Sequence, residues 1–313
     1  MMATSSASRP SLALRLWIYQ AERLPLAKTA TLLVLFTAAS INVSAALAGV
    51  ARPGYGAYLV AFIGAFVFFA HLRVCDEIKD AEDDARYRPE RPIPRGLVTL
   101  STIVQAGLAL VPVALAAAAM VAPVLIWPMA VVWVWMALMT VEFFAPAWLK
   151  SRPLAYLVSH MLIMPLIDLF VTACEWLPRG ASPPDGLWLF LALSFVNGCV
   201  LEIGRKIYAP SCERMGVETY SATWGIPAAI NGWSACLTVS AALLVAVGFK
   251  LGAPWPVAII AMGSLAAAFA AAFRFVRAPV PARQKQLDLI AGLWVAMSYA
   301  TAGFVPVLAG YLA

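Results

Sequence analysis

The chain has 313 residues, of which 63% are hydrophobic and only 12% are charged, about half the charged fraction of roughly 25% that is typical of a soluble domain. Its 22 Lys and Arg exceed its 16 Asp and Glu, so the net charge is +6. The basic residues lie between long apolar runs, so this charge does not indicate a nucleic-acid partner. The composition excludes a soluble globular chain and predicts an all-α membrane protein.

The first segment of the chain, residues 1–24, precedes the first long apolar run. It carries Arg9, Arg15 and Arg23, and it holds no stretch long enough to cross a bilayer. We expect it to be cytoplasmic and partly disordered. The remainder, residues 25–313, is expected to form a single transmembrane domain, because uncharged stretches recur through it to the C-terminus.

Nine apolar windows of roughly membrane-spanning length follow in this second part of the chain. They cover residues 29–47, 55–72, 97–120, 124–141, 154–174, 186–203, 226–249, 253–273 and 289–312. Several prolines lie in or beside these windows, where membrane helices tolerate them, so we expect kinked helices. The sequence thus predicts a polytopic bundle of nine transmembrane helices.

The Lys and Arg residues between the spans are biased to one side of the membrane. If the N-terminus is cytoplasmic, only Arg52, Arg179 and Lys250 of the 22 fall on the opposite side. The positive-inside rule therefore predicts a multi-pass protein of the cytoplasmic (inner) membrane, with its N-terminus inside and its C-terminus outside.

Six of the 16 carboxylates lie within nine residues, directly after the second span on the cytoplasmic side. They are Asp76, Glu77, Asp80, Glu82, Asp83 and Asp84. On a helix that continues from the span, Asp76, Asp80 and Asp84 share one face, and the first and last are roughly 12 Å apart. Such a row could hold one or two Mg²⁺ ions that bridge to substrate phosphates. A solvated acidic loop is the alternative.

Four arginines follow this acidic cluster in the run RYRPERPIPRG: Arg86, Arg88, Arg91 and Arg95. Guanidinium groups suit bidentate phosphate contacts, although arginines in this place could also contact lipid headgroups. A second polar cluster, with Glu202, Arg205, Lys206 and Glu213, follows the sixth span on the same side. Both clusters are therefore predicted at the cytoplasmic face of one bundle.

The run DEIKDAEDD followed by RPERPIPRG resembles the first signature of the UbiA-type intramembrane prenyltransferases. Asp80 and Asp84 match the last two acids of that signature, Glu77 stands at its first Asp, and Asp76 stands at its Asn. The segment GVETYSATWG, residues 216–225, is similar to the glycine-bounded segment that follows the second signature. The resemblance covers the whole chain and implies Mg²⁺ ligation by these four residues and binding of an isoprenoid diphosphate.

The second signature departs from the family pattern. Glu202 stands at its first position and is a further metal-ligand candidate, whereas Lys206 occupies a position that the family usually gives to an acid. A charged lysine cannot ligate Mg²⁺, so Arg205 and Lys206, together with Arg91, are expected to contact the diphosphate directly. The resemblance makes Glu77, Asp80, Asp84 and Lys206 the candidate catalytic residues.

This combination implies a Mg²⁺-dependent enzyme that ionises an allylic diphosphate and transfers the prenyl group to a lipophilic or aromatic acceptor within the bilayer. Two alternatives remain: a membrane terpene cyclase of the same superfamily, in which the substrate's own alkene captures the cation, and a small cation-coupled transporter.

Among the polar residues within the spans, Asp168 is expected to make a hydrogen bond between helices. His71 and Asn197 are expected mainly to have structural roles.

Overall fold

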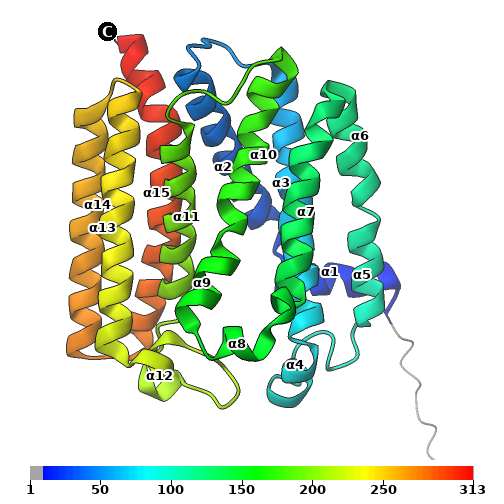
Figure 1. The fold of residues 1–313 in the computed structure, drawn as a ribbon. Coiled ribbons are helices and arrows are strands. Elements are labelled where there is room, and N and C mark those ends of the chain that lie inside the picture. The colour runs from blue at the N-terminus through cyan, green and yellow to red at the C-terminus, as the bar shows by residue number, and fades with distance from the viewer. Residues whose placement is uncertain (1–9, 313) are drawn as a thin grey trace, which may run out of the picture.

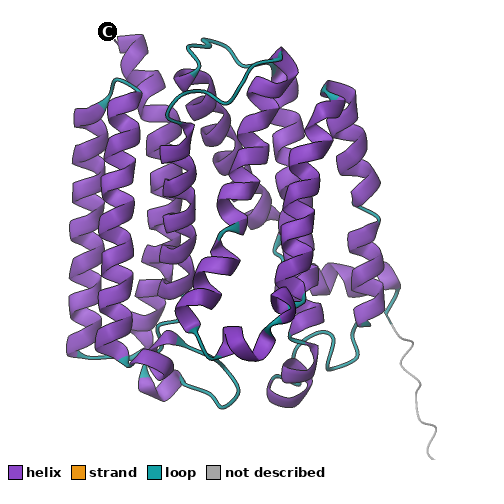
Figure 2. Cartoon of the chain, viewed as in Figure 1, coloured by secondary structure: helices purple, strands orange, loops and turns teal. Residues whose placement is uncertain are grey.

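A computed structural model describes residues 10–312, and this part of the chain is all-helical (Figures 1 and 2). The α-helices are α1 (Leu12–Arg23), α2 (Leu26–Leu47), α3 (Tyr55–Lys79), α4 (Ala81–Tyr87), α5 (Leu100–Leu108), α6 (Val111–Val121), α7 (Ile126–Thr140), α8 (Pro146–Lys150), α9 (Pro153–Met161), α10 (Ile163–Trp176), α11 (Leu187–Gly204), α12 (Tyr220–Trp224), α13 (Ile226–Lys250), α14 (Pro254–Arg277) and α15 (Pro281–Leu312). Short 3₁₀ turns are η1 (Pro123–Leu125), η2 (Glu142–Phe144), η3 (Leu177–Arg179) and η4 (Pro210–Cys212). Arg9 and the rest of residues 1–9 in the expected N-terminal segment lie outside the described residues, as does Ala313.

Nine helical stretches between residues 10 and 312 are long and apolar enough to cross a membrane. They coincide with the nine predicted windows, which confirms the expected bundle of a multi-pass membrane protein. Two helices run well past their apolar windows. α3 continues to Lys79 through the start of the acidic cluster, and α15 begins at Pro281. Charged residues at such helix ends reach the membrane interface, where they cost far less than at the bilayer centre.

Two of the spans are broken into two helices each. The third span consists of α5 and α6, and the fifth consists of α9 and α10, with the second break at Leu162. Pro165 has no N–H to donate to the carbonyl of Met161, and its ring crowds that carbonyl. Pro112 has the same relation to Leu108, the last residue of α5. The expected kinks are therefore present, and α9 leans away from the line of α10 (Figure 1).

The helices pack around two large clusters of buried apolar side chains. One cluster joins α2, α3, α7 and α10, with Phe68 and Phe170 at its centre. The other joins α11, α13, α14 and α15 around Trp233 and Phe275. α2 closes the bundle by packing along α15, and Figure 1 shows α13 and α14 side by side at one edge, opposite α5 and α6. α10 lies between the two halves and contacts both α3 and α11.

Buried polar side chains link the helices inside the bundle. Asp168 of α10 accepts hydrogen bonds from Ser40 of α2, at 2.7 Å, and from Tyr299 of α15, which confirms the interhelical bond expected of this residue. Asn197 of α11 accepts a bond from Ser240 of α13 at 2.7 Å. His71 accepts a hydrogen bond from Trp133 Nε1 at Nδ1, and its Nε2 donates to the carbonyl oxygen of Gly107. These contacts link helices within the bundle, although the buried Nδ2 of Asn197 has no hydrogen-bond partner among the described residues.

The short helices α4, α8 and α12 gather at the end of the bundle away from the C-terminus, at the bottom of Figure 1. We call this end, with the C-terminal ends of α3 and α11, the polar end. α1 lies across the bundle at the same end, near α5. Both polar clusters of the sequence follow helices that finish here, so the fold brings them to one side of the molecule.

Candidate active site

The first acidic cluster begins inside α3 and continues into α4, with Asp80 at the junction. Helical backbone bonds cross this junction: the Asp80 amide donates to the Asp76 carbonyl at 2.9 Å, and the Asp84 amide donates to the Asp80 carbonyl at 2.8 Å. Asp76, Asp80 and Asp84 therefore follow one another at successive turns, as their spacing predicts. Glu82 and Asp83 are exposed on α4.

Glu77 points away from this row, toward α1. It is buried, with 4% of its surface exposed. Its Oε1 accepts hydrogen bonds from Arg23 Nε at 2.6 Å and from the Tyr19 hydroxyl at 3.2 Å. A buried carboxylate needs such a partner, since an unpaired charge in this environment would cost several kcal/mol. The Glu77 charge is thus neutralised by the N-terminal helix.

Asp84 is also buried, and two arginines of the following loop hold it. Arg88 Nη1 lies 2.9 Å from Asp84 Oδ1, and Arg91 Nη1 lies 2.6 Å from the same oxygen. The sequence resemblance assigns Arg91 to the substrate diphosphate, but in this structure it is an ion-pair partner of Asp84. Both arginine side chains remain about a quarter exposed, and each uses only Nη1 for Asp84. Each guanidinium therefore has further N–H donors.

Asp76 and Asp80 are the least constrained acids of the row. Asp76 has one long ion pair, 3.4 Å from Arg73 Nη1, and its side chain is 47% exposed. Asp80 has no ion pair within residues 10–312. Burial and, next, the negative charge of Asp76 raise the pKa of Asp80. This crowding of like charge creates a local negative potential that favours a bound cation.

In the second cluster, both oxygens of Glu202 are taken by neighbouring cations. Arg205 Nη2 lies 2.8 Å from Oε2, and Lys206 Nζ lies 2.7 Å from Oε1. Glu202 itself is buried, whereas half of the Arg205 side chain and a third of the Lys206 side chain are exposed. Glu202 therefore fixes the direction of the two cations at the polar end.

The loop after the second cluster reaches the first one. Gly216 packs so closely on Tyr87 of α4 that a Cβ at position 216 would lie 2.3 Å from Tyr87 Cδ2. Gly216 and Gly225 both adopt positive φ, +73° and +78°, which explains why glycine bounds this segment. Glu213, the last residue of the second polar cluster, accepts hydrogen bonds from Thr219 and Ser221. It organises the loop.

Sequence reasoning missed two residues that lie between the clusters. Lys79 of α3 donates to the hydroxyl of Tyr156 on α9, and the Tyr156 ring stacks on His160 with centroids 3.9 Å apart. Lys79 lies in the middle of the acidic run, and only the carboxylates of that run were singled out as candidates. No sequence motif around Tyr156 marks it as a site residue, since only the fold places α9 beside the end of α3.

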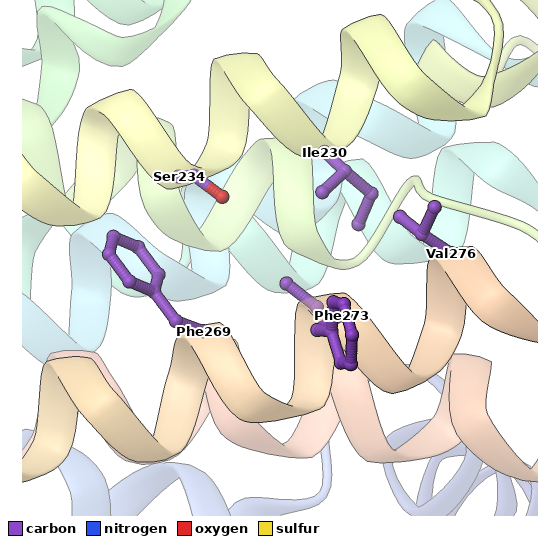
Figure 3. Close-up of a pocket in the computed structure, with 6 residues that line it drawn as sticks. Ile230, Ser234, Phe269, Phe273 and Val276 are labelled. Carbon is purple, nitrogen blue, oxygen red and sulfur yellow. The ribbon is translucent and has the colours of Figure 1, made fainter.

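A cavity of about 140 Å³ opens at this place. Its lining includes Tyr156, Lys206, Tyr220 and Thr223, together with the side chain of Lys150. Burial and the charge of Glu202 raise the pKa of Tyr220, so this phenol stays protonated. A larger apolar groove of about 270 Å³ lies between α13 and α14 and contains Ile230, Phe269 and Phe273 (Figure 3). It has no charged lining and belongs to the outer surface of these helices.

The predicted metal ligands are not assembled as one group. Among the described side chains, no three Asp, Glu, His or Cys residues converge in a way that would hold a metal ion. The chemistry of Asp76, Asp80 and Asp84 nevertheless fits Mg²⁺, which prefers carboxylate oxygens. Burial and, next, the charge of Asp76 raise the pKa of Asp80. Glu77 is paired with Arg23 of α1, and Glu202 is paired with Arg205 and Lys206 directly after α11, so the site brings together fewer free acids than the resemblance implies.

The sequence matches the UbiA prenyltransferase family over residues 32–296. This match covers most of the chain, so the protein belongs to that family and is a prenyltransferase at the family level. No curated protein matches the sequence.

Solved structures with the same fold cover almost the entire chain. One, from a study of digeranylgeranylglyceryl phosphate synthase in membranes, has a TM-score of 0.59 at 13% identity and covers 94% of this chain and 99% of its own. A UbiA homologue from Archaeoglobus fulgidus bound to DMAPP and Mg²⁺ has a TM-score of 0.55 at 13% identity, with coverage of 90% and 99%. The same homologue with GPP and Mg²⁺ has a TM-score of 0.53 at 11% identity and the same coverage.

Proposed function

We propose that the protein transfers a prenyl group from an isoprenoid diphosphate to a lipophilic or aromatic acceptor inside the membrane, with Mg²⁺ as cofactor. The observation that carries the proposal is the meeting of two unlike polar clusters at one end of a UbiA-family bundle. Carboxylates suited to Mg²⁺ end α3, and cations suited to phosphate follow α11. The related structures that hold DMAPP or GPP with Mg²⁺ support the same class of donor.

In this proposal, Asp76, Asp80 and Asp84 would hold Mg²⁺, which would supply positive charge to the leaving diphosphate. Arg205 and Lys206, oriented by Glu202, donate charge-assisted hydrogen bonds to the diphosphate. The allylic C–O bond breaks with its electron pair remaining on the diphosphate oxygen. The prenyl cation then forms a bond to the acceptor, which afterwards loses a proton. The apolar interior of the bundle keeps water from capturing the cation.

The proposed role of Glu77 differs from that of the other acids. Its partners Tyr19 and Arg23 direct it toward α1, so we propose that it fixes α3 against the N-terminal helix. Glu202 is proposed to position Arg205 and Lys206 rather than to ligate metal. We propose that the polar end is cytoplasmic in the inner membrane, which suits a water-soluble diphosphate group delivered from that side.

Substitution of the acidic row tests the proposal. Asp80→Asn and Asp84→Asn should each lower Mg²⁺-dependent diphosphate release from an allylic donor by at least about a hundredfold, because lost charge stabilisation is worth several kcal/mol. The matched control is Asp83→Asn, since Asp83 lies between them on α4 but is exposed. Release is measured on purified protein in detergent, with gel filtration as the check of folding. Near-normal release by both Asp80→Asn and Asp84→Asn would refute the proposed role of the row.

Product analysis distinguishes transfer from the two alternatives. A transferase releases diphosphate at full rate only when an acceptor is present, and the product then has the mass of acceptor plus prenyl group. A terpene cyclase converts the donor alone to a cyclic hydrocarbon. A cation-coupled transporter leaves the donor intact.

A further inference from the structure

The N-terminal helix α1 carries its apolar residues on the side away from the protein. Leu14, Trp17, Ile18 and Ala21 are spaced i, i+3, i+4 and i+7, so they form one stripe along the helix. Leu14 is 49% exposed and Trp17 is 65% exposed. Ala21 is exposed and Ile18 is half-buried. In a water-soluble protein, a stripe of this kind would face the core.

The two arginines of α1 lie away from this stripe and contact the protein, and the exposed Glu22 pairs with Arg95. Arg15 Nη1 donates to the carbonyl oxygen of Leu97 at 3.5 Å. Tyr19 and Arg23 both donate to Glu77. The ring of Tyr19 packs with Val98 and Ile103 in a small apolar cluster. The protein side of α1 therefore makes both polar and apolar contacts, with Leu16 in the same apolar cluster. The outer stripe has no such protein contact, so an apolar medium must cover it.

The position of α1 identifies that medium. Only Leu24 and Pro25 separate α1 from α2, the first membrane span, so α1 must lie at the level where the spans leave the bilayer. It runs across the bundle rather than along it (Figure 1). The lipid-facing surface of neighbouring spans continues beside it, with Leu26 and Leu32 of α2 exposed by 37% and 48%. Tryptophan is enriched at this depth of a membrane.

We propose that α1 is an interfacial helix that inserts Leu14, Trp17, Ile18 and Ala21 into the lipid of the leaflet at the polar end. On its other side, it fixes Glu77 through Tyr19 and Arg23. α1 then links the bilayer surface to the part of α3 where the acidic row begins. Helices with one apolar stripe and basic residues are known to lie in the interface in this way. The proposal does not depend on the reaction that the protein catalyses.

Spin-label accessibility tests the lipid contact. The full-length protein, with its five native cysteines replaced and its folding verified, is reconstituted into phosphatidylcholine and phosphatidylglycerol vesicles. A nitroxide is attached to Leu14→Cys, to Asp83→Cys as the aqueous reference, or to Ile259→Cys as the lipid reference, because Ile259 is 73% exposed on a span. Collisions with oxygen and with a water-soluble nickel chelate are measured for each label.

The Leu14 label is expected to collide with oxygen several times more often than with the nickel chelate, like the label at Ile259. Nickel accessibility equal to that at Asp83 would place α1 in water and overturn the proposal. Shielding from both reagents would mean that another protein surface, such as a second copy of the chain, covers the stripe. That result would also overturn it.

Whether lipid holds α1 in place is tested by amide hydrogen exchange of the peptide that contains α1. Trp17→Glu places a charge in the stripe and should increase amide exchange over residues 12–23 by about tenfold or more, because the helix loses its apolar contact with the lipid. Trp17→Leu keeps the apolar surface and should exchange like the wild type. Equal exchange in both variants would show that lipid does not hold α1, whether or not the enzyme remains active.

Discussion

Lys206 changes the charge of the second polar cluster at the candidate site. Its ammonium group lies 2.7 Å from Glu202 and lines the cavity beside Tyr156. A carboxylate at this position would add negative charge and favour a metal ion, whereas a lysine supplies a positive charge by itself. The second cluster is therefore proposed to meet the diphosphate with protein cations, while the first cluster meets it through Mg²⁺.

Lys206→Ala should weaken binding of a non-hydrolysable prenyl diphosphate analogue by about ten- to a hundredfold, because a charged hydrogen bond is worth roughly 1.5 to 3 kcal/mol. The Mg²⁺ concentration for half-maximal binding should stay nearly unchanged. Titration of the analogue at several Mg²⁺ concentrations measures both quantities. Lys285→Ala, which removes an exposed lysine at the start of α15, is the control. Wild-type affinity in Lys206→Ala would limit this lysine to a role in membrane topology.

At the scale of the helices, close packing depends on a few small residues. α2 and α15 approach each other where Gly303 faces Ala39, and a Cβ at position 303 would lie 2.4 Å from the Ala39 Cα. Backbone atoms cannot move aside as a flexible side chain can. Small residues at such crossings are how membrane helices achieve close contact.

Gly303→Ala should therefore destabilise the protein by about 1–3 kcal/mol, the usual cost of overpacking. Gly263→Ala on α14 is the matched control, because nothing lies within 4 Å of a Cβ at that position. Thermal unfolding of both variants in the same detergent gives the comparison. The predicted clash would be excluded if the two variants melted at the same temperature.

At the scale of the whole molecule, the two polar clusters lie at the same end of the bundle. Charge bias predicts that this end is cytoplasmic. In sealed inside-out vesicles, a membrane-impermeant maleimide should label Asp83→Cys and Met215→Cys, each in a background without native cysteines. Arg52→Cys, which lies after α2 at the other end, should be labelled only in vesicles of the opposite orientation. Labelling of Asp83→Cys and Met215→Cys from opposite sides would be incompatible with a shared site.

Sequence alone determined the features that depend on local composition. Apolar length predicts all nine spans, prolines in and beside the spans predict kinked helices, and the acids from Asp76 to Asp84 follow the second span. α1 was not anticipated, because its 12 residues are too few to span a bilayer, and its apolar stripe is visible only once the helix is known.

The tertiary structure decided which charges meet. Arg23 and Glu77 are 54 positions apart, and Lys79 and Tyr156 are 77 positions apart, so no local pattern could pair them. The periodicity of apolar residues places side chains on a helix, but the partner of a buried charge depends on which distant helix lies beside it. For that reason, the acids of the first cluster could be named from the sequence, whereas only the fold shows that Glu77 is paired with Arg23.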